Sequence, residues 1–322
     1  MNHRLSTTLI GLLPSAVILA GAGLLAWSWR SELPDPVAVH FSADGPDGYG
    51  SLGGFIALML GVCGAVAVGA WLVGVLLGKA AVTRRIAAGV AVGISGLGAT
   101  ILIGSLNATR GLDDAAHATG INGVIALALV IGLALGIGAA WVMPADRPYP
   151  ASGAVRGPRL DLGDQERAVW SRQVTSPMAL WLGGGATLLL VILTVVLRMP
   201  GLLAIVAILL FLLGSMTAFR VTVDTQGLRL RSALGWPRVE IPAAEITAVE
   251  VTQVRGMQEF GGFGIRVGRR GETGYVLRNG EGIRVHLTGG REVVVTVPDA
   301  HTGAALLATL AERSRNSTRP EA

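Results

Sequence analysis

The polar segment between residues 33 and 51 holds side chains whose types could do chemistry. His40, Asp44 and Asp47 could supply imidazole and carboxylate ligands for zinc or manganese. A second polar segment offers three further ligand candidates: Asp113, Asp114 and His117. The spacing matches no established ligand pattern, so the set His40, Asp44 and Asp47 is kept as a minor alternative. We expect no metal and no other cofactor.

The same segment has the composition of a stiff loop. Pro34 and Pro36 restrict the backbone of its first part, and Gly45 and Gly48 permit tight turns in its second. A stiff loop can present side chains to a ligand. The residues expected to form this ligand-contact loop are Leu33, Pro34, His40, Phe41, Gly45, Asp47 and Tyr49.

The order of these residues resembles that of a known bacterial membrane domain of unknown function. The shared features are Leu33-Pro34, then His40-Phe41 after five residues, then Gly45, Asp47-x-Tyr49 and Gly50-Ser51. That domain also occurs at the N-terminus of immunity proteins against the sporulation-delaying toxin. The similarity covers roughly residues 1–80. It implies a loop outside the cell that contacts a peptide or protein ligand.

Long apolar stretches must position this loop. None of the six contains a charged residue, and each has about the twenty residues that an α-helix needs to span a bilayer. The six stretches are Leu9–Trp27, Gly53–Leu77, Ile86–Leu106, Ile121–Met143, Met178–Leu197 and Leu202–Phe219. The mean hydropathy of +0.59 agrees. The sequence therefore predicts a polytopic α-helical membrane protein with six transmembrane helices.

The positions of the basic residues predict the orientation of these helices. Lys and Arg are retained in cytoplasmic loops. With the N-terminus inside, ten basic residues near span ends are cytoplasmic and only Arg30, Arg110 and Arg198 are outside. We therefore expect a multi-pass protein of the cell (plasma) membrane with both termini in the cytoplasm.

Composition changes divide the chain into five parts. We expect a four-span membrane domain at 1–143, a cytoplasmic linker at 144–177, a two-span hairpin at 178–218, a cytoplasmic β domain with a closing helix at 219–315, and a disordered tail at 316–322. In the β domain, Leu228 and Leu230 alternate with Arg229 and Arg231, which is typical of a half-buried strand. About seven short antiparallel strands are expected, followed by a helix that Asp299 caps. The β domain is expected to fold on its own.

Two strings in this region resemble the bacterial pleckstrin-homology-like domains that follow membrane helices. They are Gln165 to Trp170 and Phe260 to Arg266, and the resemblance covers roughly residues 160–313. It implies a domain that binds partners or membranes. Arg266, Arg269 and Arg270 are the expected membrane-surface basic patch.

The function predicted from these features is that of a non-enzymatic integral membrane binding protein, sensory or immunity-like. Its partners would be the lipid bilayer, an external peptide or protein ligand at the loop, and a cytoplasmic protein. The sequence pI of 10.3 comes from arginine, and no aromatic-interleaved basic groove points to nucleic acid. The alternative is a transporter, or its accessory subunit, for an uncharged solute, because no span contains Asp, Glu, Lys, Arg or His. A metal-dependent enzyme using the His/Asp loops is a further alternative.

Overall fold

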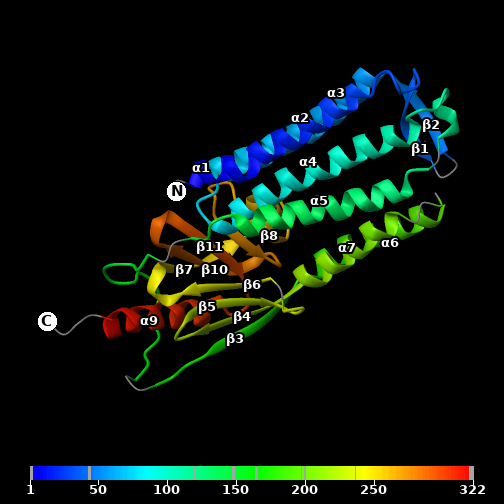
Figure 1. Cartoon of the computed structure of the whole chain (residues 1–322). Coiled ribbons are helices and arrows are strands. Elements are labelled where there is room, and N and C mark those ends of the chain that lie inside the picture. Colours follow the sequence, from blue (N-terminus) through cyan, green and yellow to red (C-terminus); the bar gives the residue numbers. More distant parts are fainter. Residues whose placement is uncertain are drawn as a thin grey trace. The chain divides into compact units, whose positions relative to one another are not determined.

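In the computed structural model the chain divides into two compact units. The helical unit joins Met1–Ala145 with Thr187–Ile208, and the β unit joins Asp146–Ala186 with Leu209–Ala322. The structure describes residues 3–42, 45–118, 120–146, 149–163, 166–196, 198, 201–235 and 237–318. Figure 1 labels their elements.

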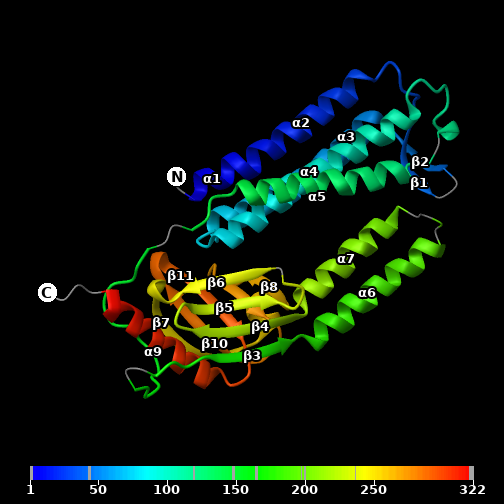
Figure 2. The same cartoon turned by 60° about the horizontal axis from the view of Figure 1, so that its bottom comes forward.

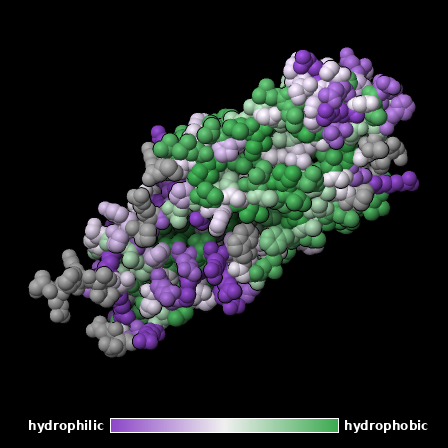
Figure 3. All heavy atoms as spheres, in the orientation of Figure 1, coloured by the Kyte–Doolittle hydropathy of each residue, from purple (hydrophilic) through white to green (hydrophobic). Residues whose placement is uncertain are grey.

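The apolar stretches form helices. The first helix runs without interruption from His3 to Ser28 and contains α1 (His3–Thr7), the π-helical turn η1 (Thr8–Leu12) and α2 (Leu13–Ser28). The others are α3 (Leu52–Leu76), α4 (Ala81–Thr109), α5 (Asn122–Val142), α6 (Pro177–Val196) and α7 (Leu202–Met216). Hydrophobic residues cover these helices in Figure 3.

Five of these helices are long and apolar enough to cross a membrane, which indicates a multi-pass membrane protein. The sixth predicted span is shorter than expected, because α7 has only 15 residues and ends at Met216. Phe219, the expected end of that span, instead lies in a β-strand with its side chain 1% exposed in the β core. A hydrophobic residue of a buried strand directly after a span cannot be distinguished from the span by hydropathy alone.

Small residues bring α4 and α5 together. A Cβ added at Gly136 would lie 2.7 Å from the Gly89 carbonyl oxygen, and one added at Gly132 would lie 2.9 Å from that of Gly93. Gly89 with Gly93 and Gly132 with Gly136 are each separated by three residues, and this spacing lets the backbones of two helices approach closely in lipid.

A buried arginine holds the ends of three elements of the helical unit. Arg84, near the start of α4, is 6% exposed. Its guanidinium donates hydrogen bonds to the carbonyl oxygens of Gly78 at 2.8 Å, Lys79 at 3.0 Å and Pro144 at 3.2 Å. The carbonyls at the end of a helix lack helical partners, so the arginine satisfies groups that follow α3 and α5.

The β unit contains two sheets, a short helix and a closing helix. The four-stranded sheet has the order β3-β4-β5-β6, and all its pairs are antiparallel. Its strands are β3 (Trp170–Thr175), β4 (Ala218–Asp224), β5 (Gly227–Ser232) and β6 (Arg238–Pro242).

The five-stranded sheet has the order β7-β10-β11-β9-β8. Its strands are β7 (Ile246–Val254), β8 (Gly264–Val267), β9 (Thr273–Val276), β10 (Gly280–Leu287) and β11 (Arg291–Thr296). The pair β9–β11 is parallel, which differs from the expected all-antiparallel arrangement.

The remaining elements of the chain are the short helix α8 (Gly256–Phe260), the closing helix α9 (Ala300–Thr318), the hairpin strands β1 (Val37–Ser42) and β2 (Gly45–Gly50), and the 3-10 turns η2 (Ala115–His117), η3 (Ala243–Glu245) and η4 (Thr288–Gly290).

Both sheets and α9 share one hydrophobic core. The predicted inward residues Leu228 and Leu230 are 0% and 1% exposed. The prediction from alternation is therefore confirmed. Three leucines of the closing helix are buried in the same core: Leu306, Leu307 and Leu310.

The segment 144–177 is more than the expected linker. It contributes β3, and Trp170 is 5% exposed within the core. Its earlier part lies against the edge of β7, where Arg156 accepts a hydrogen bond from the Val249 N–H at 2.8 Å and donates one to the Thr247 carbonyl at 3.2 Å. A fragment starting at Phe219 would lack all of these contacts. The β unit of the structure thus begins near Asp146 and not at Phe219, and independent folding of 219–315 stays a prediction.

Two smaller expectations concern the ends of the closing helix. The tail was expected to be disordered from residue 316, but α9 continues to Thr318, because no helix-breaking residue precedes Pro320. Asp299 directly precedes α9 as expected, yet its carboxylate accepts hydrogen bonds from side chains, those of Thr302, Trp170 and Arg172.

Gln165, the first residue of one resembling string, lies outside the described residues.

Along the chain, α6 and α7 connect β3 to β4, and these two strands pair with each other. Residues of β3 and β4 pair from Trp170 with Val223 to Thr175 with Ala218, so α6 begins and α7 ends at the same end of this sheet. The Ser176 N–H donates to the Thr217 carbonyl at 2.8 Å and continues the ladder to the helix ends. Figure 2 shows β3 leading into α6 and β4 leading out of α7.

Candidate functional site

The ligand-contact loop predicted at 33–51 folds into a β-hairpin. β1 and β2 pair antiparallel, with Val37 opposite Gly50 and Ser42 opposite Gly45. Gly45 has φ of 125°, a conformation that side chains other than glycine rarely adopt. The Ser42 hydroxyl donates to the Gly45 carbonyl at 3.1 Å. Gly45 is therefore at a position where the backbone requires a glycine.

His40 and Asp47 face each other across this hairpin. His40 Nδ1 lies 2.5 Å from Asp47 Oδ1, and the two side chains are 73% and 46% exposed. Gly48 is the residue opposite His40, and a Cβ there would lie 2.8 Å from the His40 Cβ. The glycine thus leaves room for the imidazole to reach the neighbouring carboxylate. The carboxylate orients the ring, so the pair presents a fixed polar group at the surface.

The metal alternative gains no third ligand in the described part of the chain. Asp44 lies outside the described residues. Asp114 accepts a hydrogen bond from the Ala116 N–H at 2.9 Å and caps η2. Among the residues that the structure describes, no three His, Cys, Asp or Glu side chains come together. The described geometry therefore supports a hydrogen-bonded pair at this position.

Phe41, which follows His40, points the other way and anchors the hairpin. Its side chain is 7% exposed and packs with Ala38 and with Ala115 and Ala118 around η2. Two neighbouring residues thus have opposite roles, and the register shifts on both sides of His40 place Phe41 with Ala38 on the buried side. Phe41 holds the hairpin on the loop between α4 and α5, and His40 is presented to solvent. Tyr49 is also exposed, and its hydroxyl donates to the Pro46 carbonyl at 3.0 Å.

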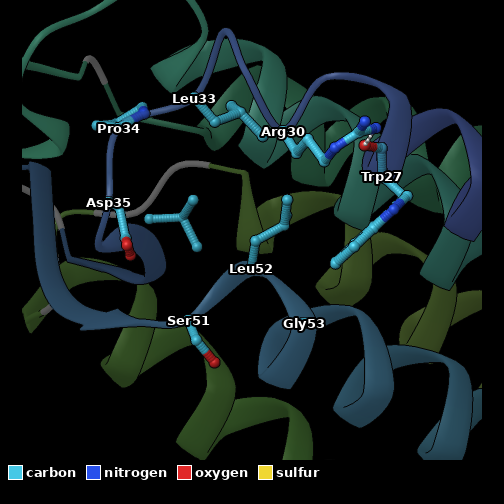
Figure 4. Close-up of a pocket in the computed structure, with 9 residues that line it drawn as sticks. Trp27, Arg30, Leu33, Pro34, Asp35, Ser51, Leu52 and Gly53 are labelled. Carbon is cyan, nitrogen blue, oxygen red and sulfur yellow. Dashed lines mark hydrogen bonds between the residues drawn. The ribbon is translucent and has the colours of Figure 1, made fainter.

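Leu33 and Pro34 line a cavity beside the hairpin. The cavity has a volume of about 230 Å³ and lies where α2 ends and α3 begins. Figure 4 shows Trp27, Leu33 and Leu52 on its apolar wall, with Asp35 and Arg30 as the charged groups. Leu33 also packs on the core formed by α2, α3 and α4. The first residues of the predicted loop are therefore wall residues, whereas His40, Asp47 and Tyr49 form the exposed surface.

Two residues outside the predicted ligand-contact loop brace this region. The Arg110 guanidinium lies 2.7 Å from the Glu32 carboxylate and 4.6 Å from the centroid of the Trp29 ring. The Gly111 N–H also donates to the Glu32 carbonyl at 2.8 Å. These contacts tie the end of α2 to the end of α4. The sequence does contain a signal for this ion pair, because Glu32 and Arg110 carry opposite charges and closely follow two of the predicted spans.

The predicted basic patch lies on one hairpin of the β unit. Arg266 is exposed on β8, and its Nε donates to the Phe263 carbonyl at 2.9 Å. Arg269 and Arg270 are exposed in the turn before β9, where the Arg270 N–H donates to Glu272 at 2.9 Å. The three arginines share a hairpin, but no ladder pairing aligns their side chains on one face.

Comparison with known proteins leaves the site to be interpreted from its own geometry. No protein family, no curated protein sequence and no solved structure matches this chain.

Proposed function

We propose that this chain is a six-span protein, with α7 as the sixth span. The support is the pairing of β3 with β4, which holds the start of α6 and the end of α7 at one end of a sheet. If α6 crosses the bilayer, the chain must cross it again before β4, and α7 is the apolar helix available. Its 15 residues correspond to about 22 Å, so the bilayer thins or polar flanks reach the interface around it.

The proposed orientation places both termini and the β unit in the cytoplasm of a bacterial cell and the β1–β2 hairpin outside. The support is the ten-to-three distribution of basic residues for this orientation. We further propose that the β unit is pleckstrin-homology-like. Two sheets closed by a C-terminal helix around a single core support this assignment.

Within this topology the protein acts as a non-enzymatic membrane binding protein, sensory or immunity-like, and the hairpin is its contact surface. The observation that carries the proposal is the division of roles within the hairpin. Phe41 is buried against the η2 loop, while His40, Asp47 and Tyr49 are held exposed. An exposed polar group on a pre-organised backbone costs little ordering entropy when a peptide or protein partner binds.

A photo-crosslinking experiment in intact cells tests the contact surface. A benzophenone amino acid replaces Tyr49, whose side chain is 43% exposed. We expect a discrete adduct with a peptide or protein, and we expect the His40→Ala change to abolish it without lowering abundance. The same photoreactive group at Asp113, exposed in the neighbouring loop, is the control and should yield no such adduct.

Three outcomes would count against the proposal. Loss of abundance in His40→Ala would show a structural role for the exposed imidazole. Unchanged adducts in His40→Ala would remove the His40–Asp47 pair from the contact. Saturable flux of an uncharged solute through liposomes containing the purified chain would favour the transport alternative.

A further inference from the structure

Three arginines stand next to one another across the four-stranded sheet of the β unit. Arg220 on β4 pairs with Arg231 on β5, and Arg231 pairs with Arg238 on β6. Residues directly opposite each other share a face of the sheet, with Cβ atoms about 5 Å apart. All three side chains are exposed, while their strand neighbours Phe219, Val221 and Leu230 are buried. We refer to Arg220, Arg231 and Arg238 as the arginine row.

Charge is separated along the outer face of this sheet. The arginine row ends on Gln173 of β3 and contains no acidic residue. In the next row of the same face, farther from the helices, Arg229 lies opposite Glu240. Arg229 also forms an ion pair with Asp224. In the described part of the chain, no acidic group forms an ion pair with an arginine of the row.

Such an arrangement lowers the stability of the isolated sheet. Like charges directly opposite one another across strands are destabilising. The sheet nevertheless presents three in line, each with a planar guanidinium that suits bidentate binding of phosphate oxygens. A bound anion would offset this repulsion.

The row lies close to the ends of α6 and α7. Arg220 follows Met216, the last residue of α7, by four residues, or about 13 Å of extended chain. Among the described residues, the outward ones between the row and the helices are the small Ala218 and Ala233, beside Thr175. At the tip of the β5–β6 turn, the exposed Leu234 packs against Gly214 in the last turns of α7. The row therefore lies within reach of the headgroups of the leaflet from which the two helices emerge.

We propose that the arginine row is a binding site for the phosphate groups of anionic lipids in that leaflet. The proposal rests on the proposed membrane crossing by α6 and α7, but it is independent of the function of the hairpin. It also moves the membrane-binding surface away from Arg266, Arg269 and Arg270. Those three are not aligned by strand pairing, whereas the arginine row is.

The test uses the full-length chain in detergent, titrated with phosphatidylglycerol or with phosphatidylcholine and observed by native mass spectrometry. The row variant carries Arg220→Gln, Arg231→Gln and Arg238→Gln. The matched control removes the same charge through Arg266→Gln, Arg269→Gln and Arg270→Gln. A basic residue near an anionic surface contributes about fivefold, so the row variant should bind phosphatidylglycerol about 100-fold more weakly. The control should change by less than threefold.

Further measurements distinguish lipid binding from binding of a soluble anion and from a purely structural role of the arginines. Because the change relieves like-charge repulsion, the row variant should unfold at an equal or higher temperature than the wild type. Inorganic phosphate in excess should not displace phosphatidylglycerol. The proposal is overturned if the row variant binds phosphatidylglycerol like the wild type, if the control loses as much, or if the wild type does not discriminate between the two lipids. Displacement by free phosphate would mean that the ligand is a soluble anion, and loss of folding in the row variant would mean that the arginines are structural.

A separate measurement keeps this test distinct from that of the topology. A cysteine at Asn316 in a Cys63→Ala background should react with a membrane-impermeant thiol reagent only after the cells are permeabilised. If it reacts in intact cells, the proposed orientation fails. The lipid titration is then still interpretable, because it does not depend on which leaflet faces the cytoplasm.

Discussion

Gly136 allows the packing of the helical unit to be tested with a single added methyl group. A Cβ at this position would lie 2.7 Å from the Gly89 carbonyl oxygen and 3.4 Å from the Gly93 Cα. Both are backbone atoms of α4, so no side-chain rotation can relieve the clash. Helices α4 and α5 would have to separate by about 0.7 Å to restore ordinary contact distances.

The expected cost of Gly136→Ala follows from this geometry. Inserting a methyl group into a well-packed interface typically costs about 1–3 kcal/mol. Alanine is also a better helix former than glycine by about 0.5–1 kcal/mol in water, which offsets part of this cost. Gly138 lies on the same helix, and nothing lies within 4 Å of a Cβ added there. Gly138→Ala therefore isolates the helix-propensity term, and the difference between the two variants measures the clash.

The lone cysteine provides the assay. Cys63 is 5% exposed in α3, and its sulfur packs against Gly98 of α4. A maleimide that becomes fluorescent on reaction with a thiol will therefore report opening of the helical unit during heating. With about 2–4 °C per kcal/mol for a unit of this size, Gly136→Ala should lower the Tm by about 2–12 °C relative to Gly138→Ala.

Two results would refute this reasoning. Equal Tm values for Gly136→Ala and Gly138→Ala would mean that α4 and α5 do not approach at these glycines. A lower Tm for Gly138→Ala alone would place the contact on the opposite face of α5.

Three further predictions concern other elements, and those in the β unit are read with a buried reporter thiol, Ala311→Cys, in a Cys63→Ala background. Trp170→Ala should destabilise the β unit by about 3–5 kcal/mol, because it empties a core position. Arg84→Met should lower the Tm of the helical unit, because three carbonyl oxygens lose their hydrogen bonds to the guanidinium. A hydrogen bond to a charged group contributes about 1.5–3 kcal/mol to stability. The pKa of Asp299 is lowered by hydrogen bonds from Thr302 and Trp170 and by the charge of Arg172. The ionised carboxylate therefore stabilises the folded β unit at a pH above the unfolded pKa of about 4. This stabilisation is lost as the pH falls through the lower pKa of the folded state. Acid should therefore lower the Tm of wild-type chain below about pH 4 more steeply than that of Asp299→Asn.

Neighbouring residues supply the controls for these variants. Val169→Ala removes an apolar side chain that is 69% exposed, and it should change stability by less than about 0.5 kcal/mol. Arg85→Met removes the exposed arginine next to Arg84. The hydrogen bond from Arg85 to the Met143 carbonyl is long, at 3.4 Å. An effect of Arg85→Met as large as that of Arg84→Met would contradict the anchoring role of Arg84.

The elements that could be predicted from the sequence are those whose signal is local. Five predicted spans are long apolar helices, because twenty apolar residues in succession have few other stable arrangements. Leu228 and Leu230 point inward because alternation within one strand determines its buried face. Leu307 lies inward on α9 for the corresponding reason of helical spacing.

The elements that escaped prediction depend on partners far away in the chain. β3 is a strand because it pairs with β4 across the whole of α6 and α7, and its own residues Trp-Ser-Arg-Gln-Val-Thr carry only a weak alternation. Its surroundings are rich in proline, glycine and arginine, which favoured a linker. The parallel pairing of β9 with β11 likewise follows from the arrangement of the sheet and not from a local turn signal.

The same distinction applies to the sites. His40 and Asp47 could be found because both lie in one short segment with turn residues between them. The arginine row could not, although Arg229 and Arg231 were recognised as the outward residues of a strand. Only the registers of β4 with β5 and of β5 with β6 bring Arg220, Arg231 and Arg238 together. A shift of one residue in either register would break the row, because the strand neighbours of these arginines, such as Phe219, Val221 and Leu230, lie on the opposite face.

If α6 and α7 cross the bilayer as proposed, their position between paired strands also links membrane insertion to folding of the β unit. The ladder from Trp170 to Thr175 can form only when Ala218 to Val223 return beside it, and the two apolar helices lie between these strands in the chain. Trp170 belongs to the core that both sheets share with α9, so the core is incomplete until that pairing forms. A chain whose helical hairpin fails to insert would therefore leave Trp170 and its core partners exposed. In that topology we expect insertion of the hairpin to come first and closure of the β core by β3 to come after it.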